Sequence, residues 1–379
     1  MLACNLRKFG RSVLVLERGF IGGESSGTSF GSLRLQGTHG QALELALHSQ
    51  AIWRTVEEEL GESVEFDASG HVHLALDDHQ VGRIEENARQ MRAFGEDVDI
   101  LGPDEIRSRW PFLHHKILAA AWSRRDALVN PRLVAPAFAR AAVRLGARIV
   151  EHAEVIDVQL SAGHFRLRTG NAAIPVAEAG ILVNAAGAWS GQVAAMFGED
   201  IPVFAAGPAE MVTEPVAPFV SQVMHVVDGS VLFRQTRRGN IVAGGHPRLS
   251  VDATKRRNRV PSEKMVTNLN RLISIAPGLS AHHVLRTWTG IEGYIADMTP
   301  VVGPSLTIPG MYHICAFSGH GLQAGPAATR ALAELIDAGR TDLPIAGLGI
   351  ERFATSPAQA VSTIHEEFYD NVVPKEDTS

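Results

Sequence analysis

The sequence predicts an α/β protein of two domains. At 379 residues the chain is too long for one compact core. Residues 311–336 read as an apolar strand, a glycine turn at Ser318-Gly319-His320-Gly321, and a helix with apolar positions at helical spacing. Residues 201–288 instead show short apolar strands separated by turns, with one long helix at Ser262–Ile275. This change of pattern indicates a second, α+β domain built on an antiparallel sheet.

The composition is that of a globular enzyme rich in tight turns. Hydrophobic residues make up 45% and charged residues 20%, and there are 36 glycines. The net charge of −6 provides no basic surface for nucleic acid. Cys4 and Cys315 lie far apart, which favours a reducing, cytoplasmic location without a disulfide framework. We expect no transmembrane segment, because no apolar run reaches about 18 residues, and no signal peptide is recognisable.

The first residues predict the end of a helix at Met1–Gly10, followed by a strand at Ser12–Leu16. Glu17 ends this strand, where an acid of a dinucleotide-binding unit accepts hydrogen bonds from the adenosine ribose. The matching G-x-G-x-x-G turn would stand about 20 residues earlier, before Met1. Either the start is misassigned or the chain lacks part of the cofactor site.

Residues 22–31 form a polar, glycine-rich stretch, which is most often a flexible surface loop. Arg34 follows it, between Leu33 and Leu35. An unpaired charge is costly to bury in such surroundings, so we expect a substrate carboxylate to be its bidentate partner.

Two histidines stand on the strand predicted at residues 66–76. His71 and His73 are two positions apart and would share one face. No third ligand lies at a useful spacing, so an exposed strand is the better interpretation and no metal site is predicted.

Residues 130–196 predict a strand-helix-strand passage. Pro131 opens a helix at residues 133–145, and strands follow at 147–150 and 153–160. A further buried strand at 179–184 ends in small residues. They fit either a close approach of the backbone to a diphosphate or ordinary helix-on-sheet packing.

Four motifs resemble one family. Residues 317–326 (FSGHGLQAGP), 13–18 (VLVLER), 184–190 (NAAGAWS) and 289–304 (TGIEGYIADMTPVVGP) are similar to segments of the FAD-dependent amine oxidoreductases. This group contains glycine oxidase, sarcosine oxidase and D-amino-acid dehydrogenase. The motifs occur in the family's order and span most of the chain.

The resemblance implies an FAD-binding Rossmann-like domain of the glutathione-reductase type, here N-terminally truncated, at residues 1–65, 130–196 and 290–379. A substrate or cap domain would comprise residues 66–129 and 197–289. FAD should be bound non-covalently, because Gly290 aligns where some members carry the linking cysteine and Cys315 lies on another strand. By resemblance, the catalytic residues are Arg34, His320 and Gln323, and the cofactor-binding residues are Glu17, Arg18, Ser25, Ser26, Val155, Ala186, Gly187, Gly319, His320, Gly321, Leu322 and Gln323.

The implied activity is oxidation of the C–N bond of an amino acid or secondary amine, such as a D-amino acid, sarcosine or a proline derivative, to an imine that hydrolyses. Glu292 replaces the carboxylate-binding arginine of glycine oxidases, and Gln323 replaces a lysine that sarcosine oxidases use with oxygen. The electron acceptor is therefore O2 or another carrier. Two alternatives stay open: a flavin-poor or inactive member or subunit, with a partner subunit, and a 2-hydroxy acid dehydrogenase of the same fold.

Overall fold

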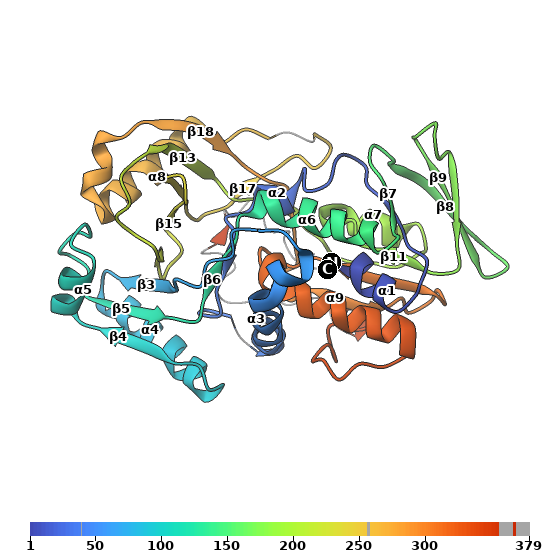
Figure 1. The fold of residues 1–379 in the computed structure, drawn as a ribbon, viewed down its shortest axis with the longest axis horizontal. Coiled ribbons are helices and arrows are strands. Elements are labelled where there is room, and N and C mark those ends of the chain that lie inside the picture. The colour runs from blue at the N-terminus through green and yellow to red at the C-terminus, as the bar shows by residue number, and fades with distance from the viewer. Residues whose placement is uncertain (39, 256–257, 356–366, 369–379) are drawn as a thin grey trace, which may run out of the picture.

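A computed structural model describes residues 1–38, 40–255, 258–355 and 367–368. Two small sheets and the helices around them form one end of the molecule (Figure 1). In the first sheet, strands β1 and β7 pair in parallel; in the second, β21 pairs in parallel with β11 and antiparallel with β20. The elements are α1 (Leu2–Lys8), β1 (Leu14–Leu16), α3 (Gly40–Leu60), α6 (Pro131–Arg144), β7 (Arg148–Val150), β11 (Leu182–Asn184), β20 (Val301–Pro304), β21 (Met311–Cys315) and α9 (Gly321–Ala338).

An antiparallel three-stranded sheet projects beyond this end of the molecule (Figure 1). It is built of β8 (Val155–Ser161), β9 (His164–Thr169) and β10 (Val176–Ala179). Phe165 on β9 is fully buried and packs edge-on against Phe197.

The other end of the molecule contains an eight-stranded sheet. Every neighbouring pair is antiparallel, as predicted, except β14 and β3, which are parallel, so the sheet as a whole is mixed. Its strands come from the two ranges predicted for the cap, whose boundaries stay a prediction. The order is β18 (Val284–Trp288), β13 (Glu210–Pro215), β16 (Asn240–Gly244), β15 (Leu232–Gln235), β14 (Val223–Val226), β3 (His71–Ala75), β5 (Ala119–Ser123) and β4 (Val98–Leu101).

Helices complete this end of the molecule, and an apolar cluster beneath α8 includes Leu272, Ile275, Phe233 and Met224. Such a cluster forms because strand side chains on one face and the apolar stripe of a helix are removed from water together. The helices are α4 (Asp78–Ala93), α5 (Pro103–Arg109), α8 (Ser262–Ile275) and the 3-10 turn η2 (Pro277–Ala281).

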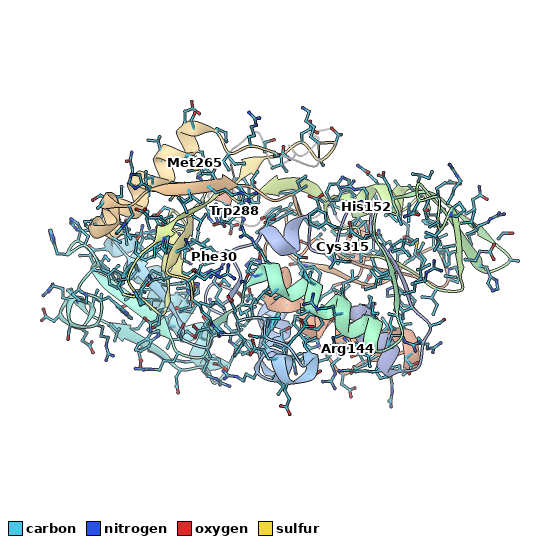
Figure 2. All side chains as sticks on the ribbon, turned by 45° about the horizontal axis from the view of Figure 1, so that its top comes forward. Phe30, Arg144, His152, Met265, Trp288 and Cys315 are labelled. Atoms are coloured by element: carbon cyan, nitrogen blue, oxygen red, sulfur yellow. The ribbon has the colours of Figure 1, made fainter. Side chains whose placement is uncertain are left out.

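Short elements connect the two ends. Trp288 donates its indole N–H to the carbonyl oxygen of Thr28 (2.9 Å), and it packs in one apolar cluster with Phe30 (both aromatic residues are labelled in Figure 2). This contact fastens the loop before Arg34 to the large sheet. The remaining short elements are α2 (Ser25–Thr28), β2 (Ser32–Leu33), β6 (Ala127–Leu128), η1 (Gly187–Trp189), α7 (Ser190–Ala195), β12 (Phe204–Gly207), β17 (Leu249–Ser250), β19 (Glu292–Tyr294) and α10 (Arg352–Thr355).

Several sequence predictions are confirmed and others need correction. The helix at Ser262–Ile275 is observed as predicted, and α6 begins at Pro131, with the Asn130 side chain accepting a hydrogen bond from the backbone N–H of Arg132 (3.2 Å). The loop at 22–31 contains one helical turn, α2. In the described part of the chain, no helix has the length and apolar character needed to cross a bilayer. Residues 356–366 and 369–379 of the predicted C-terminal range lie outside the described residues.

Candidate functional site

The turn between β21 and α9 presents exposed backbone at a helix N-terminus. The backbone takes positive φ at Ala316 (53°), Ser318 (49°) and Gly319 (81°), and the N–H of Ser318 donates to the carbonyl oxygen of Gly293 (3.2 Å). The N-cap residue of α9, His320, makes no side-chain capping bond, and Gly319 and Gly321 are exposed. Uncapped N–H groups and the helix dipole favour a negatively charged ligand here.

Helix α3 holds the first turn of α9 in place. Pro326 has no N–H, so the carbonyl oxygen of Leu322 has no helical partner from that position. The indole N–H of Trp53 donates to this oxygen instead (2.9 Å). The hydroxyl of Ser49 donates to Ala324 O (3.1 Å) and accepts from Ala327 N (3.0 Å). The proline therefore disturbs the helix without leaving its groups unsatisfied.

Two of the three predicted catalytic residues lie in this turn. Gln323 is buried, and its amide Nε2 donates to the hydroxyl of Thr38 (2.7 Å). Burial, with the charge of Arg34 adding, lowers the pKa of His320 to about 4. His320 is therefore neutral near pH 7, and its ring does not supply a fixed positive charge.

Several segments predicted to bind the cofactor pack against residues 290–293, whose Gly293 carbonyl oxygen accepts from Ser318. A Cβ on Gly293 would lie 3.0 Å from the carbonyl oxygen of Gly187 and 3.1 Å from Ala188 Cα. A Cβ on Gly290 would clash with the hydroxyl of Thr28, in the helical turn that contains Ser25 and Ser26. The glycines at 290 and 293 thus permit close packing of backbone from chain regions that are far apart in sequence.

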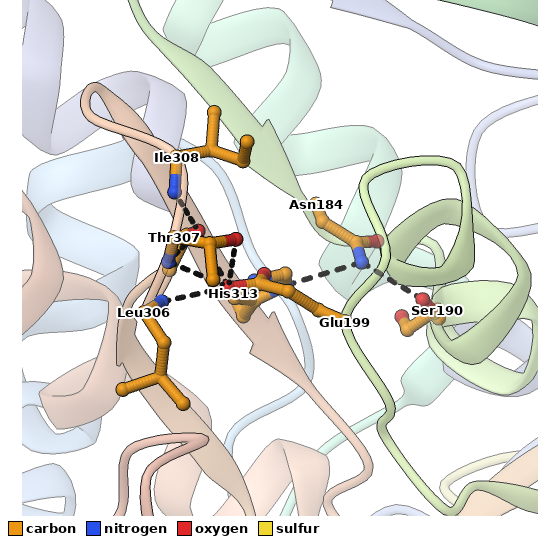
Figure 3. Close-up of polar contacts among 8 residues, drawn as sticks. Asn184, Ser190, Glu199, Leu306, Thr307, Ile308 and His313 are labelled. Carbon is orange, nitrogen blue, oxygen red and sulfur yellow. Dashed lines mark hydrogen bonds and ion pairs between the residues drawn. The ribbon is translucent and has the colours of Figure 1, made fainter.

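A buried polar network fixes the turn that contains Ala186 and Gly187 (Figure 3). Asn184 Nδ2 lies 2.9 Å from Ser190 O, to which it donates, and 3.2 Å from His313 Nδ1. His313 Nε2 lies 2.9 Å from Glu199 Oε2. Burial lowers the pKa of His313, so its neutral ring accepts from Asn184 and donates to Glu199. The other Glu199 oxygen accepts from the hydroxyl of Ser305 and the backbone N–H groups of Leu306 and Thr307.

The predicted adenosine-binding residues gather at the end of β1. The backbone N–H of Gly19 donates to Glu17 Oε1 (2.6 Å), and the N–H of Ala153 donates to Glu17 O (2.8 Å). The second bond brings the start of β8, with Val155, beside Glu17. The Arg18 guanidinium stacks on the ring of Trp189, 3.9 Å from its centroid. This arrangement fits a ribose at Glu17, which stays a prediction.

Arg34 lies two residues before Gln36 in a partly buried position. Its guanidinium Nη1 donates to the carbonyl oxygen of Gln36, and burial lowers its pKa. Within the described ranges, no carboxylate forms an ion pair with it. The charges of Glu367 and then Asp126 act against this lowering of the Arg34 pKa, but Glu367 pairs with Arg248 (3.5 Å). Asp126 Oδ1 accepts from the backbone N–H of Leu35 (2.9 Å), and burial raises the pKa of Asp126 to about 7. Arg34 is therefore a cation that can accept an anionic partner.

A second, partly buried cation near this site was missed from the sequence. Arg248 pairs with Glu292 (3.4 Å) and Glu367 (3.5 Å), and it lies over the Tyr294 ring, whose hydroxyl donates to Glu292. Its Nη2 would be 3.0 Å from a Cβ on Gly319. No signal marked it, because an arginine after a glycine turn is usually solvated. Arg286, the alternative carboxylate-binding cation, is exposed on β18.

Near Arg248, Glu210 is buried, and its Oε2 has no hydrogen-bond partner within the described part of the chain. Burial, with the charge of Glu292 adding, raises the pKa of Glu210 to about 8. The carboxyl is therefore largely protonated at pH 7.

The prediction that His71 and His73 stand on an exposed strand without a third ligand is wrong. Both are buried on β3, and His225 on the parallel neighbour β14 lies against them. The sequence could not show this, because strand pairing joins positions 152 residues apart.

Comparisons with known proteins agree with this geometry. A family model described as "DAO: FAD dependent oxidoreductase" matches residues 1–335. The chain is 27% identical to glycine oxidase of Bacillus licheniformis, covering 95% of each chain. It is 26% identical to sarcosine oxidase subunit beta of Rhizobium meliloti (strain 1021), covering 92% of this chain and 83% of that one. The crystal structure of L-proline dehydrogenase from P. horikoshii superposes with a TM-score of 0.87 at 26% identity, covering 94% and 95% of the two chains.

Proposed function

Because the chain belongs to the DAO family of FAD-dependent oxidoreductases, we propose that it oxidises the C–N bond of an amino acid or secondary amine that carries a carboxylate. The chain is an FAD-dependent oxidoreductase, and FAD is its cofactor. Non-covalent attachment of FAD is part of the proposal. It is supported by Gly290, the position aligned with the linking cysteine of some members.

The observation that carries the proposal is Arg34, a cation without an ion-pair partner among the residues described. It follows β2, which packs near α9, and its charge lowers the pKa of His320 in the first turn of that helix. A substrate carboxylate would complete its pairing by two parallel N–H···O bonds. These two bonds would fix the carboxylate end of the substrate, so that the amine-bearing carbon can point toward the cofactor.

The residues around the turn at 318–321 have a defined role in this scheme. FAD, when bound, supplies the acceptor for the hydride that leaves the carbon bearing the amine. The exposed backbone N–H groups at the start of α9 stabilise negative charge by about 0.3–2 kcal/mol through the helix dipole. Trp53 and Ser49 keep this helix start rigid, so the N–H groups are oriented before the ligand arrives.

The electron acceptor is either O2 or another carrier. Gln323 is neutral and its amide is bound to Thr38, which favours a carrier other than O2 because no lysine stands at that position. A partner subunit is supported by the similarity to a relative that is named as a subunit, sarcosine oxidase subunit beta. Co-purification from the source cell would test it.

Matched pairs of compounds test the proposal on the wild-type protein. Sarcosine is compared with dimethylamine, and each proline enantiomer with pyrrolidine, by following anaerobic bleaching of the bound flavin. The carboxylated member of an accepted pair should bleach the flavin about 10- to 150-fold faster, the equivalent of about 1.5–3 kcal/mol for a charged hydrogen bond. Equal rates within pairs would contradict the role of the carboxylate. A protein that retains no flavin and oxidises none of the panel would favour the flavin-poor alternative, and bleaching only by 2-hydroxy acids would favour the hydroxy acid dehydrogenase.

A further inference from the structure

Three histidines converge inside the eight-stranded sheet. His71 and His73 stand two positions apart on β3 and therefore share one face, and His225 on β14 is directly opposite His73 in the parallel register. The ring centroids are 5.2, 5.6 and 4.7 Å apart, and the ring planes are inclined by 71° to 85°. One ring nitrogen from each residue lies within 4.8 Å of the others.

The nitrogens are buried and incompletely satisfied. The three side chains belong to residues that are 1%, 2% and 8% exposed. His225 Nδ1 lies 3.1 Å from His73 Nε2, but the Nδ1 atoms of His71 and His73 have no hydrogen-bond partner among the described residues. Buried polar atoms are usually paired, so these two atoms indicate a missing ligand. Burial favours the neutral imidazole, the form that binds metals.

We propose that His71, His73 and His225 bind one Zn²⁺ ion through three imidazole nitrogens, with a water or small anion as the fourth ligand. Three protein ligands with one open position are a common zinc arrangement, and imidazole is a ligand that zinc accepts readily. Tetrahedral zinc–nitrogen bonds of about 2.0–2.1 Å place the ligand nitrogens about 3.4 Å apart. The three nitrogens, which lie within 4.8 Å of one another, therefore have to draw closer together when the ion binds.

The surroundings favour an anion as the fourth ligand. A Cβ on Gly37 would lie 2.9 Å from Arg34 Nη1 and 3.7 Å from His73 Cε1, so the guanidinium is close to the histidines. The positive charge of Arg34 would repel a bare Zn²⁺ ion. A negatively charged fourth ligand between Zn²⁺ and Arg34 would offset this repulsion. Gln36 positions the strand: its Nε2 donates to the carbonyl oxygen of His71 (3.0 Å), and its buried Oε1 has no partner among the described residues.

The ion would join two distant parts of the chain. β3 and β14 form the one parallel pair in this sheet, and they bring together the strands from residues 71–123 and from residues 210–288. A metal bound across this pair would stabilise the junction in the folded state only, because the three ligands are not close together in the unfolded chain.

Zinc content of the flavin-containing full chain tests the proposal. The protein is produced with zinc in the medium, dialysed against metal-free buffer and measured by mass spectrometry. We expect about one Zn²⁺ per chain in the wild type. The zinc content of His73→Gln should be at least about tenfold lower, because that variant lacks one of the ligands. His283→Gln is the matched control: it removes an exposed histidine beside Glu214, where zinc could bind adventitiously, and it should retain the metal.

Two further measurements need no variant. Zinc-edge X-ray absorption of the wild type should show three imidazole nitrogens in the first coordination shell, and added zinc should raise the Tm of chelator-treated protein. Zinc far below one per chain after growth in zinc, or a coordination shell without imidazole, would overturn the proposal. Zinc lost in His283→Gln but kept in a folded His73→Gln would likewise assign the metal to the surface and overturn it.

Discussion

Trp53 donates its indole N–H to the carbonyl oxygen of Leu322, the oxygen that Pro326 leaves without a partner in α9. One side chain of α3 thus completes the first turn of the helix whose N-terminus forms the candidate cofactor site. The relationship predicts that stability and cofactor retention depend on a residue outside the turn itself.

Trp53→Phe should lower the free energy of unfolding by about 1–3 kcal/mol, because a partly buried carbonyl oxygen loses its hydrogen bond. Urea denaturation measures this change, and flavin absorbance per chain should fall in the same variant. Thr55→Ala, on the exposed side of α3, is the control and should behave as wild type. Unchanged stability in Trp53→Phe would show that the oxygen is satisfied by other means.

The fold was largely predictable from local patterns. The helix Ser262–Ile275 has strong apolar periodicity, and the strand at 311–315 leads into a glycine turn, so the sequence alone located both. The mixed character of the large sheet was not predictable, because it depends on one parallel pairing between β3 and β14, which are far apart along the chain. A local sequence pattern shows which face of a strand is apolar, but it does not show which other strand pairs with it.

The candidate site was predictable only where it consists of short motifs. The segment that contains Gly319 and His320 is recognisable because turn residues have local signatures. Arg248 and His225 are not recognisable, since their burial and partners come from tertiary packing. The same limit produced the wrong prediction of an exposed strand at His71 and His73.

Asn184→Ala should release the turn at 186–190. The amide group is lost from both Ser190 O and His313 Nδ1, and these buried acceptors are left without a donor. We expect a loss of about 1–3 kcal/mol in unfolding free energy and a lower flavin content. Thermal denaturation and absorbance measure the two effects, and Gln159→Ala on the exposed face of β8 is the control. Full flavin content in Asn184→Ala would mean that this turn does not position the cofactor.

Glu210 should make stability depend on pH. Its pKa is 4.5 when unfolded and is raised to about 8 by burial in the folded chain, where Glu292 adds to the effect. Between these values the folded chain keeps a proton that the unfolded chain has released. The free energy of unfolding contributed by this group therefore falls as pH rises from 4.5 to 8, with a slope approaching about 1.4 kcal/mol per pH unit.

Urea denaturation at several pH values compares the wild type with Glu210→Gln. The difference in unfolding free energy between them should shift in favour of the variant as pH rises from 5 to 8. Glu263→Gln, at an exposed position in the first turn of α8, should follow the wild type. A Glu210→Gln curve parallel to the wild type over this range would show that Glu210 is ionised throughout.

The binding of the substrate carboxylate by Arg34 can be tested directly by substitution. The measurement is kcat/KM for an accepted amino acid and for its decarboxylated analogue in Arg34→Gln, with Arg286→Gln on exposed β18 as the matched control. Arg34→Gln should lose about 10- to 150-fold on the amino acid, from a charged hydrogen bond worth about 1.5–3 kcal/mol, and little on the analogue, with flavin content unchanged. Equal losses on both substrates, or the larger loss in Arg286→Gln, would contradict the assignment.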